Sequence, residues 1–184
     1  MKYVLASSSP RRKDLMKLIS SDFLIDVSNV DEDVHHSLTP EKITKEIAYR
    51  KGDVVRKRHP DDIVISADTI VVIDNEIIGK PKDEKDAKNI LRRLSDRTHL
   101  VHTAYWIFYK DKEISNIVTS EVIFNKLSDE LINRYVESKS PLDKAGAYGV
   151  QDNQTFPIVK EIKGSLNNVI GFPVEEILVS LKQL

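Results

Sequence analysis

The stretch Ile63-Val64-Ile65-Ser66-Ala67-Asp68-Thr69-Ile70-Val71-Val72-Ile73 decides the fold class. It is rich in β-branched and apolar residues, which favour an extended strand, and it is the strongest strand pattern in the chain. Asp68 and Thr69 interrupt the apolar run at its middle. A carboxylate in such surroundings is costly to bury unless it is paired with a cation or bound to a metal. Asp68 is therefore a candidate functional residue, the alternative being an Asp at a strand end that points into solvent.

Strand and helix patterns alternate on both sides of this stretch. Before it, residues 2–6 predict a short strand that leads into Ser9-Pro10, a cap followed by a residue suited to the first helical position, so a helix is expected to about Ile19. After it, Asp74-Asn75 predicts a hairpin turn, and Asp83 begins another helix. The other expected elements are strands at residues 23–28, 99–109, 113–124 and 156–162, and helices at 39–58, 128–138 and from 173 onwards. This alternation predicts an α/β protein with a single domain over residues 1–184.

Composition excludes several classes of function. The formal net charge of -1 argues against a basic surface for nucleic acid, and the absence of cysteine excludes disulfides and thiolate chemistry. No apolar run approaches the roughly 20 residues that a transmembrane helix needs. We therefore expect a cytoplasmic protein with no nucleic-acid or membrane partner, in which any bound phosphate is held by local cations.

The segment Ser7-Ser8-Ser9-Pro10-Arg11-Arg12 is a candidate phosphate site. A strand that turns into a helix N-terminus presents free backbone N–H groups, which suit an anion, and arginine binds phosphate through two parallel hydrogen bonds. Arginines in a first helical turn oppose the preference of the helix dipole, and a bound polyphosphate would explain them. The alternative is an ordinary capped helix with surface arginines.

The acidic segment Asp31-Glu32-Asp33 offers hard oxygen ligands of the kind that magnesium or manganese prefers. The alternative is a solvated acidic loop. His35-His36 lies nearby, but no thiolate or HExxH spacing accompanies it, so a zinc site is not expected.

Two further segments carry groups that suit a nucleotide. Gly79-Lys80-Pro81 lacks the upstream glycine and the Ser or Thr of a P-loop, yet Lys80 can still bind a single phosphate group. In Asp143-Lys144-Ala145-Gly146-Ala147-Tyr148-Gly149-Val150-Gln151, small residues allow close approach of a flat ligand. Gln151 there offers both a donor and an acceptor, as reading a base edge requires.

Five motifs of the sequence together resemble the Maf family of septum-formation-type nucleotide pyrophosphatases. In chain order, they are Leu5-Ala6-Ser7-Ser8-Ser9-Pro10-Arg11-Arg12, Ala67-Asp68-Thr69, Gly79-Lys80-Pro81, residues 143–151, and Gly164-Ser165 with Gly171-Phe172-Pro173. The resemblance runs nearly end to end. It implies a mixed, twisted sheet flanked by helices, with two lobes around a cleft, similar to the inosine-triphosphate pyrophosphatase architecture. It also implies hydrolysis of a nucleoside triphosphate to the monophosphate and pyrophosphate.

The resemblance further implies a role for each matching residue. Pro10-Arg11-Arg12, Asp68-Thr69 and the Gly146–Gln151 motif match the branch that acts on dTTP and UTP, rather than the branch that acts on 7-methyl-GTP. Asp68 would be the proton acceptor, and Arg11, Thr69 and Gln151 would set base preference. The phosphate and metal site would comprise Ser7, Arg12, Glu32, Lys51 and Lys80, with Glu32 and Asp68 as ligands of magnesium or manganese.

Three residues depart from the family pattern: Asp152 and Gly52 stand where Gly and Ala are usual, and Phe172 replaces a Leu. Gly52 and Phe172 suggest altered packing, whereas Asp152 adds negative charge next to the proposed base reader. Two alternatives stay open, a 7-methyl-GTP pyrophosphatase and a nucleotide-sensing module in division control. The oligomeric state also stays open, and a homodimer is one of the alternatives.

Overall fold

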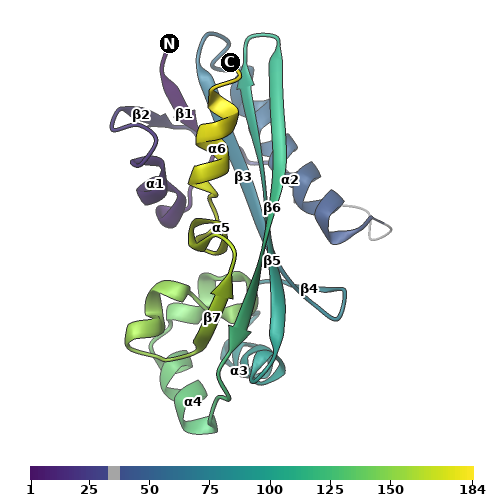
Figure 1. Ribbon diagram of the computed structural model, residues 1–184, viewed down its shortest axis with the longest axis vertical. Helices are drawn as coiled ribbons and strands as arrows, with labels where there is room; N and C mark the ends of the chain where they lie inside the picture. Colours follow the sequence, from purple (N-terminus) through teal and green to yellow (C-terminus); the bar gives the residue numbers. More distant parts are fainter. Residues whose placement is uncertain (33–37) are drawn as a thin grey trace. The chain divides into compact units, whose positions relative to one another are not determined.

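The structure, a computed structural model, describes residues 1–32 and 38–184 (Figure 1). It contains a mixed sheet in the order β2-β1-β3-β5-β6-β7, with β4 paired to β3. The strands are β1 Tyr3–Leu5, β2 Phe23–Ile25, β3 Ile63–Ile73, β4 Glu76–Ile78, β5 Thr98–Tyr109, β6 Lys112–Phe124 and β7 Val159–Lys163. The helices are α1 Pro10–Met16, α2 Pro40–Arg56, α3 Glu84–Leu94, α4 Asp129–Glu137, α5 Leu166–Ile170 and α6 Val174–Leu181, and the 3-10 helices are η1 Ser140–Asp143, η2 Ala145–Ala147 and η3 Val150–Gln154. The predicted fold class, a mixed sheet with flanking helices, is confirmed.

The chain forms two compact units. The first unit comprises Met1–Thr69, His102–Val118 and Asn167–Leu184, and the second comprises Ile70–Val101 and Thr119–Leu166. The strands β3, β5 and β6 each contribute residues to both units. Among the described residues, no helix is long and apolar enough to cross a membrane.

Helices pack on both faces of the strands in the first unit. The strand β1 pairs in parallel with both β2 and β3, so that Tyr3 lies opposite Phe23 and Ile63. Side chains alternate along a strand, and one face of β1, β3 and β5 packs against α1 and α6, whereas the other packs against α2 (Figure 1). The first face contributes Leu5, Ile63, Ile65, Ala67, Tyr105 and Ile107, and the second contributes Val4, Ala6, Val64 and Phe108.

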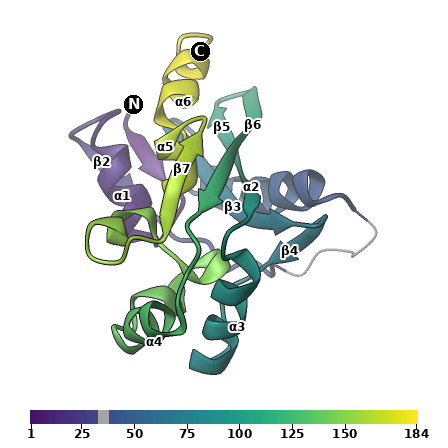
Figure 2. The ribbon, with the colours of Figure 1, turned by 60° about the horizontal axis from the view of Figure 1, so that its bottom comes forward.

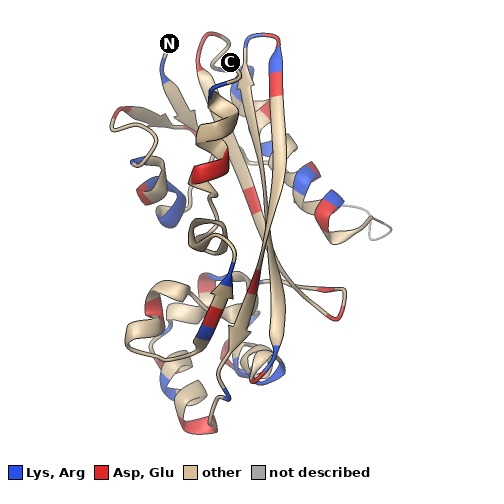
Figure 3. Ribbon diagram, viewed as in Figure 1, with Lys and Arg blue, Asp and Glu red and all other residues tan. Residues whose placement is uncertain are grey.

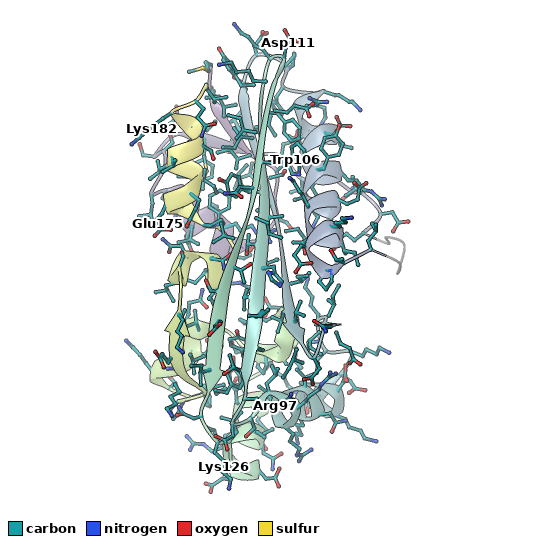
Figure 4. The ribbon with its side chains drawn as sticks, turned by 45° about the vertical axis from the view of Figure 1, so that its right-hand side comes forward. Arg97, Trp106, Asp111, Lys126, Glu175 and Lys182 are labelled. Carbon is teal, nitrogen blue, oxygen red and sulfur yellow. The ribbon has the colours of Figure 1, made fainter. Side chains whose placement is uncertain are left out.

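The close packing of α2 on the sheet depends on Gly52. A Cβ atom on Gly52 would lie 2.2 Å from Cε2 of Phe108 and 2.6 Å from Oγ of Ser66. The same side of β5 carries Trp106, which points toward α2 and donates its indole N–H to the Lys45 carbonyl at 3.0 Å (Figure 4). A methyl group at position 52 therefore does not fit this packing, because the Phe108 ring occupies the space that it would need.

The second unit contains the predicted hairpin and two capped helices. Asp74 and Asn75 both adopt positive φ angles, 54° and 62°, in the turn between β3 and β4. Asp83 caps α3 by accepting a hydrogen bond from the Asp86 amide at 2.7 Å, and Ser128 caps α4. The helices α3 and α4 contact each other (Figure 2).

Three elements differ by three or more residues from the bounds that the sequence predicted. The first helix ends at Met16 instead of Ile19, because the chain tightens into a turn in which the Leu18 amide donates to the Leu15 carbonyl. The second strand ends at Ile25. The strand expected at 156–162 is Val159–Lys163, because the Phe156 amide closes a turn on Asp152 and the following Pro157 has no N–H. The 3-10 helices between Ser140 and Gln154 and the short helix α5 were not predicted.

Candidate functional site

Asp68 and Thr69 are neighbours on β3 but face opposite sides of the strand. Asp68 follows Val64 and Ser66 on the side of α2, and Thr69 follows Ile65 and Ala67 on the side of α1. Asp68 is the only charged residue in the sequence of β3, so the strand carries a single acidic band in Figure 3. The site therefore has two groups of side chains, one on each face.

On the face of α2, one lysine binds two carboxylates. The Lys51 Nζ atom lies 2.8 Å from Asp68 Oδ1 and 2.9 Å from Glu32 Oε1. The Lys51 and Asp68 side chains are 14% and 11% exposed, whereas that of Glu32 is 62% exposed. Pairing with Lys51 compensates for the burial of the Asp68 carboxylate. The prediction that Asp68 is a buried, paired carboxylate is confirmed, and the solvent-facing alternative is wrong.

On the face of α1, the Arg12 guanidinium makes three hydrogen bonds. It donates from Nε to the Gly171 carbonyl at 2.8 Å, from Nη2 to Thr69 Oγ1 at 3.1 Å and from Nη1 to Ser7 Oγ at 3.3 Å. The Thr69 hydroxyl also lies 2.9 Å from that of Thr103. The planar guanidinium matches this set of acceptors, and its position next to Ser7 and Thr69 is therefore fixed.

The two faces are coupled electrostatically. Burial lowers the pKa of Arg12, and the neighbouring charge of Arg11 lowers it further, while Asp68 and Glu32 raise it. Asp68, Glu32, Lys51 and Arg12 therefore form one charge cluster in the first unit. An additional anion would be stabilised by the arginines and by Lys51.

The predicted phosphate-binding segment has the expected local structure. Ser9 caps α1 by accepting a hydrogen bond from the Arg12 amide at 3.4 Å, and the Ser9 amide donates to Ser7 Oγ at 3.2 Å. Ser7 is buried, and Arg11 is half-buried in the first turn. The Arg12 side chain that follows it is held by the three acceptors described above.

The remaining predicted residues, Lys80 and Gln151, lie in the second unit. Both side chains are exposed. The Gly146 amide donates to the Gly79 carbonyl at 3.1 Å, which joins the Lys80 loop to the segment that leads to Gln151. Gly146 adopts a φ angle of 72°, and a Cβ atom there would lie 3.0 Å from a Val71 methyl group, so a glycine is required.

Asp152, the departure next to Gln151, is engaged by two hydroxyl groups. Its Oδ2 atom accepts hydrogen bonds from Tyr135 at 2.6 Å and from Ser140 at 2.7 Å. The charge of Asp152 is therefore bound within the second unit instead of being an unattached charge next to Gln151.

The candidate metal ligands Glu32 and Asp68 fit a divalent cation in part. Both are hard oxygen donors, and their carboxylates converge on one positive charge, that of Lys51. Within residues 1–32 and 38–184, no group of three or more His, Asp or Glu side chains is arranged to hold a metal. Two protein carboxylates, completed by phosphate and water oxygens, are a common way to bind magnesium. Asp33, His35 and His36 lie outside the described residues.

The Maf-like protein family model matches residues 2–184. The chain belongs to the Maf family. Relatives named dTTP/UTP pyrophosphatase include one from Bacillus velezensis, 42% identical over 180 residues, which are 98% of this chain and 95% of the relative. Another, from Bacillus cytotoxicus, is 40% identical over 182 residues, which are 99% and 95% of the two chains.

Solved structures with the same fold are much more distant from this Maf chain in sequence. A HAM1 protein from Coxiella burnetii has a TM-score of 0.55 at 15% identity, with 100% of each chain covered. The Ham1 protein of Staphylococcus aureus has a TM-score of 0.55 at 16% identity and covers 100% of this chain and 99% of its own. This likeness extends to the fold alone, and it agrees with the architecture that the Maf resemblance implied.

Two residues that contact the candidate site, Thr103 and Gly171, were not among the site residues predicted from the sequence. Thr103 is fully buried and connects the Thr69 hydroxyl to the Asn168 carbonyl, to which it donates at 3.0 Å. Gly171 was noted only as part of a motif, yet its carbonyl is an acceptor for Arg12, and its φ angle is 116°. A threonine among the apolar residues of β5 was the signal available for Thr103. Phe172, the third departure, is fully buried in the core next to α6.

Proposed function

We propose that this protein hydrolyses dTTP and UTP to the monophosphate and pyrophosphate. The observation that carries the proposal is the charge cluster of the first unit, in which Lys51 joins Asp68 to Glu32 while Arg12 is held next to Ser7 and Thr69. A buried carboxylate next to fixed cations can accept a proton from water while the cations stabilise the charge that develops on the phosphate. The printed names of the Bacillus relatives support the choice of substrate.

In this proposal the first unit carries the chemistry. Arg11, Arg12 and Lys51 neutralise phosphate oxygens next to the start of α1. Within the described residues, Lys51 binds Asp68 through Oδ1, and Oδ2 takes no hydrogen bond. Oδ2 is therefore the atom proposed to accept the proton of the attacking water.

A divalent cation assists this chemistry in the proposal. Glu32 and Asp68 would hold magnesium or manganese, which would supply positive charge against the triphosphate. A triphosphate that approaches Lys51 competes for its ammonium group, and Asp68 is then able to orient water. Ser7 binds and positions in this scheme and does not attack.

The second unit supplies the base preference in this proposal. Lys80 would bind a phosphate oxygen, and the Gln151 amide would pair with the O4 and N3–H groups that uracil and thymine share. Arg11 and Thr69 would contribute to the same preference. We further propose that residues 1–184 act as a single functional domain, as a monomer or a homodimer, in the cytoplasm, where nucleoside triphosphates are found.

A substrate panel with separate detection of pyrophosphate and monophosphate tests the proposal. We expect dTTP and UTP to yield the two products in equal amounts, with kcat/KM roughly 10-fold or more above that for 7-methyl-GTP. Activity should stop with a chelator and return with magnesium or manganese, because the ligands are hard oxygens. Release of orthophosphate, full activity after exhaustive chelation, or tight binding of dTTP without turnover would contradict the proposal.

A further inference from the structure

Residues 149–153, which include Gln151, are held within the second unit by hydrogen bonds at three points. The Gly149 amide donates to the Tyr135 hydroxyl at 2.9 Å, and Asp152 accepts from the hydroxyl groups of Tyr135 and Ser140. The Asn153 side chain exchanges two hydrogen bonds with the backbone of Val159, at 2.7 and 2.9 Å. The Gln151 side chain, in contrast, is exposed.

The Tyr135 hydroxyl is central to this arrangement. The Tyr135 ring is fully buried on α4, and the pKa of its hydroxyl is raised by burial and by the carboxylate of Asp152. The hydroxyl group therefore stays protonated and donates to Asp152, while its oxygen accepts from Gly149. One buried side chain thus joins the residues on both sides of Val150-Gln151.

We propose that Asp152 is a positioning residue that holds residues 149–154 in one conformation and thereby presents the Gln151 amide to the base of the substrate. The role rests on the proposed function, because it assumes that Gln151 binds the base. A side chain on a fixed segment loses less conformational freedom on binding than one on a mobile segment. Asp152 accordingly acts on substrate binding and leaves the step at the phosphate unaffected.

Steady-state kinetics with dTTP test the role of Asp152. Asp152→Ala removes the acceptor of two hydrogen bonds, so we expect KM to rise about 10-fold while kcat stays within about threefold of the wild-type value. Asp152→Asn keeps an oxygen that accepts from both hydroxyl groups, and should return KM to within about threefold. Tyr135→Phe removes the shared hydroxyl and should behave like Asp152→Ala.

Glu137→Ala is the matched control, since it removes one carboxylate from an exposed position on α4 and should leave both constants unchanged. Ser140→Ala, which removes one of the two donors, is the gentler variant if Asp152→Ala does not fold; a smaller rise in KM supports the role, and an unchanged KM contradicts it. A wild-type KM in a folded Asp152→Ala, or a fall in kcat alone, would overturn the proposal.

Amide hydrogen exchange without nucleotide separates this proposal from the proposed function. Residues 149–154 should exchange about 10-fold faster in Asp152→Ala than in the wild type, while the β3 amides are unchanged. If the wild type does not hydrolyse dTTP, the proposed function fails. Faster exchange in Asp152→Ala would still support the inference that Asp152 holds residues 149–154 in one conformation. Unchanged exchange with normal hydrolysis would overturn the role of Asp152 alone.

Discussion

At the scale of single residues, His99 shows how burial sets the charge of a side chain. It is 2% exposed on β5, its Nε2 atom lies 2.8 Å from the Tyr148 hydroxyl, and its ring meets that of Phe124 edge-on. Burial lowers the pKa of His99 from 6.5 to about 4. The imidazole is therefore neutral in the folded protein at neutral pH.

His99 should make the protein less stable as the pH falls below neutrality. The unfolded chain binds a proton near pH 6.5 and the folded chain only near pH 4, so stability is full above pH 6.5 and declines between these values. We expect the free energy of unfolding to fall by about 2 kcal/mol from pH 7 to pH 5 on account of this group. Urea titrations at the two pH values measure the change.

The control for this prediction is His99→Gln, which retains an amide that can pair with Tyr148 and does not titrate. Its loss of stability between pH 7 and pH 5 should be smaller than that of the wild type by about 2 kcal/mol. Equal losses in the two proteins would show that the wild-type His99 is not held neutral by burial.

Sequence alone indicated which residue types carry the chemistry, but not what they contact. The apolar run around Asp68 predicted a paired carboxylate, and Lys51 is its partner. The hydrogen bond from Arg12 to Gly171 joins residues that are 159 positions apart, and no local pattern encodes such a contact. The sequence likewise could not show that the charge of Asp152 is bound by Tyr135 and Ser140.

At the scale of elements, β3 organises the site because it presents different chemistry on its two faces. The face toward α2 carries Asp68 and the face toward α1 carries Thr69. Each of these side chains binds a cationic side chain from the helix on its own face. Lys51 comes from α2, and Arg12 from α1. The spacing between α2 and the sheet then decides whether Lys51 reaches Asp68.

Gly52→Ala should destabilise the protein, although alanine is the better helix former. The added methyl group would lie 2.2 Å from the Phe108 ring, and overpacking of this kind costs about 1–3 kcal/mol, against roughly 1 kcal/mol gained from helix propensity. We expect a net loss of about 1 kcal/mol, and at most about 2 kcal/mol, in the free energy of unfolding. Chemical denaturation at neutral pH measures it.

Two further variants make this prediction specific. In Phe108→Leu the ring is absent, so adding Gly52→Ala should cost less stability than it does in the wild type. In a double-mutant cycle, the double mutant should therefore lose less free energy of unfolding than the sum of the two single mutants. Gly79→Ala is the matched control, because its methyl group would meet nothing within 4 Å, and it should change stability by less than about 0.5 kcal/mol. Equal costs for Gly52→Ala with and without the ring would refute the packing argument.

Most elements were predictable from the sequence because their signals are local. Pro10, Asp83 and Ser128 mark the helix starts, and the Asp74-Asn75 hairpin was found from its turn residues. The 3-10 helices of the second unit carry no such pattern. Contacts such as that between Asp152 and Tyr135 hold them, and these contacts exist only once the chain has folded.

At the scale of the whole molecule, the candidate site residues are distributed over both compact units. The first unit contains the charge cluster of Asp68, Glu32, Lys51 and Arg12, and the second contains Lys80 and Gln151. The Maf family model spans both. In the proposed function, the first unit carries catalysis and the second carries base preference, and Asp68 is the residue that accepts the proton.

Asp68→Asn tests whether Asp68 accepts the proton, and Asp53→Asn is the control. Both changes replace an ion-paired carboxylate of the first unit, and Asp53 binds Arg56 and Lys57 away from the charge cluster. The measurement is the rate of pyrophosphate release from saturating dTTP, on variants whose melting curves show that they are folded. We predict that Asp68→Asn lowers kcat by about 10²–10⁴-fold, while Asp53→Asn stays within about threefold of the wild type. A folded Asp68→Asn with near-normal turnover would contradict the account.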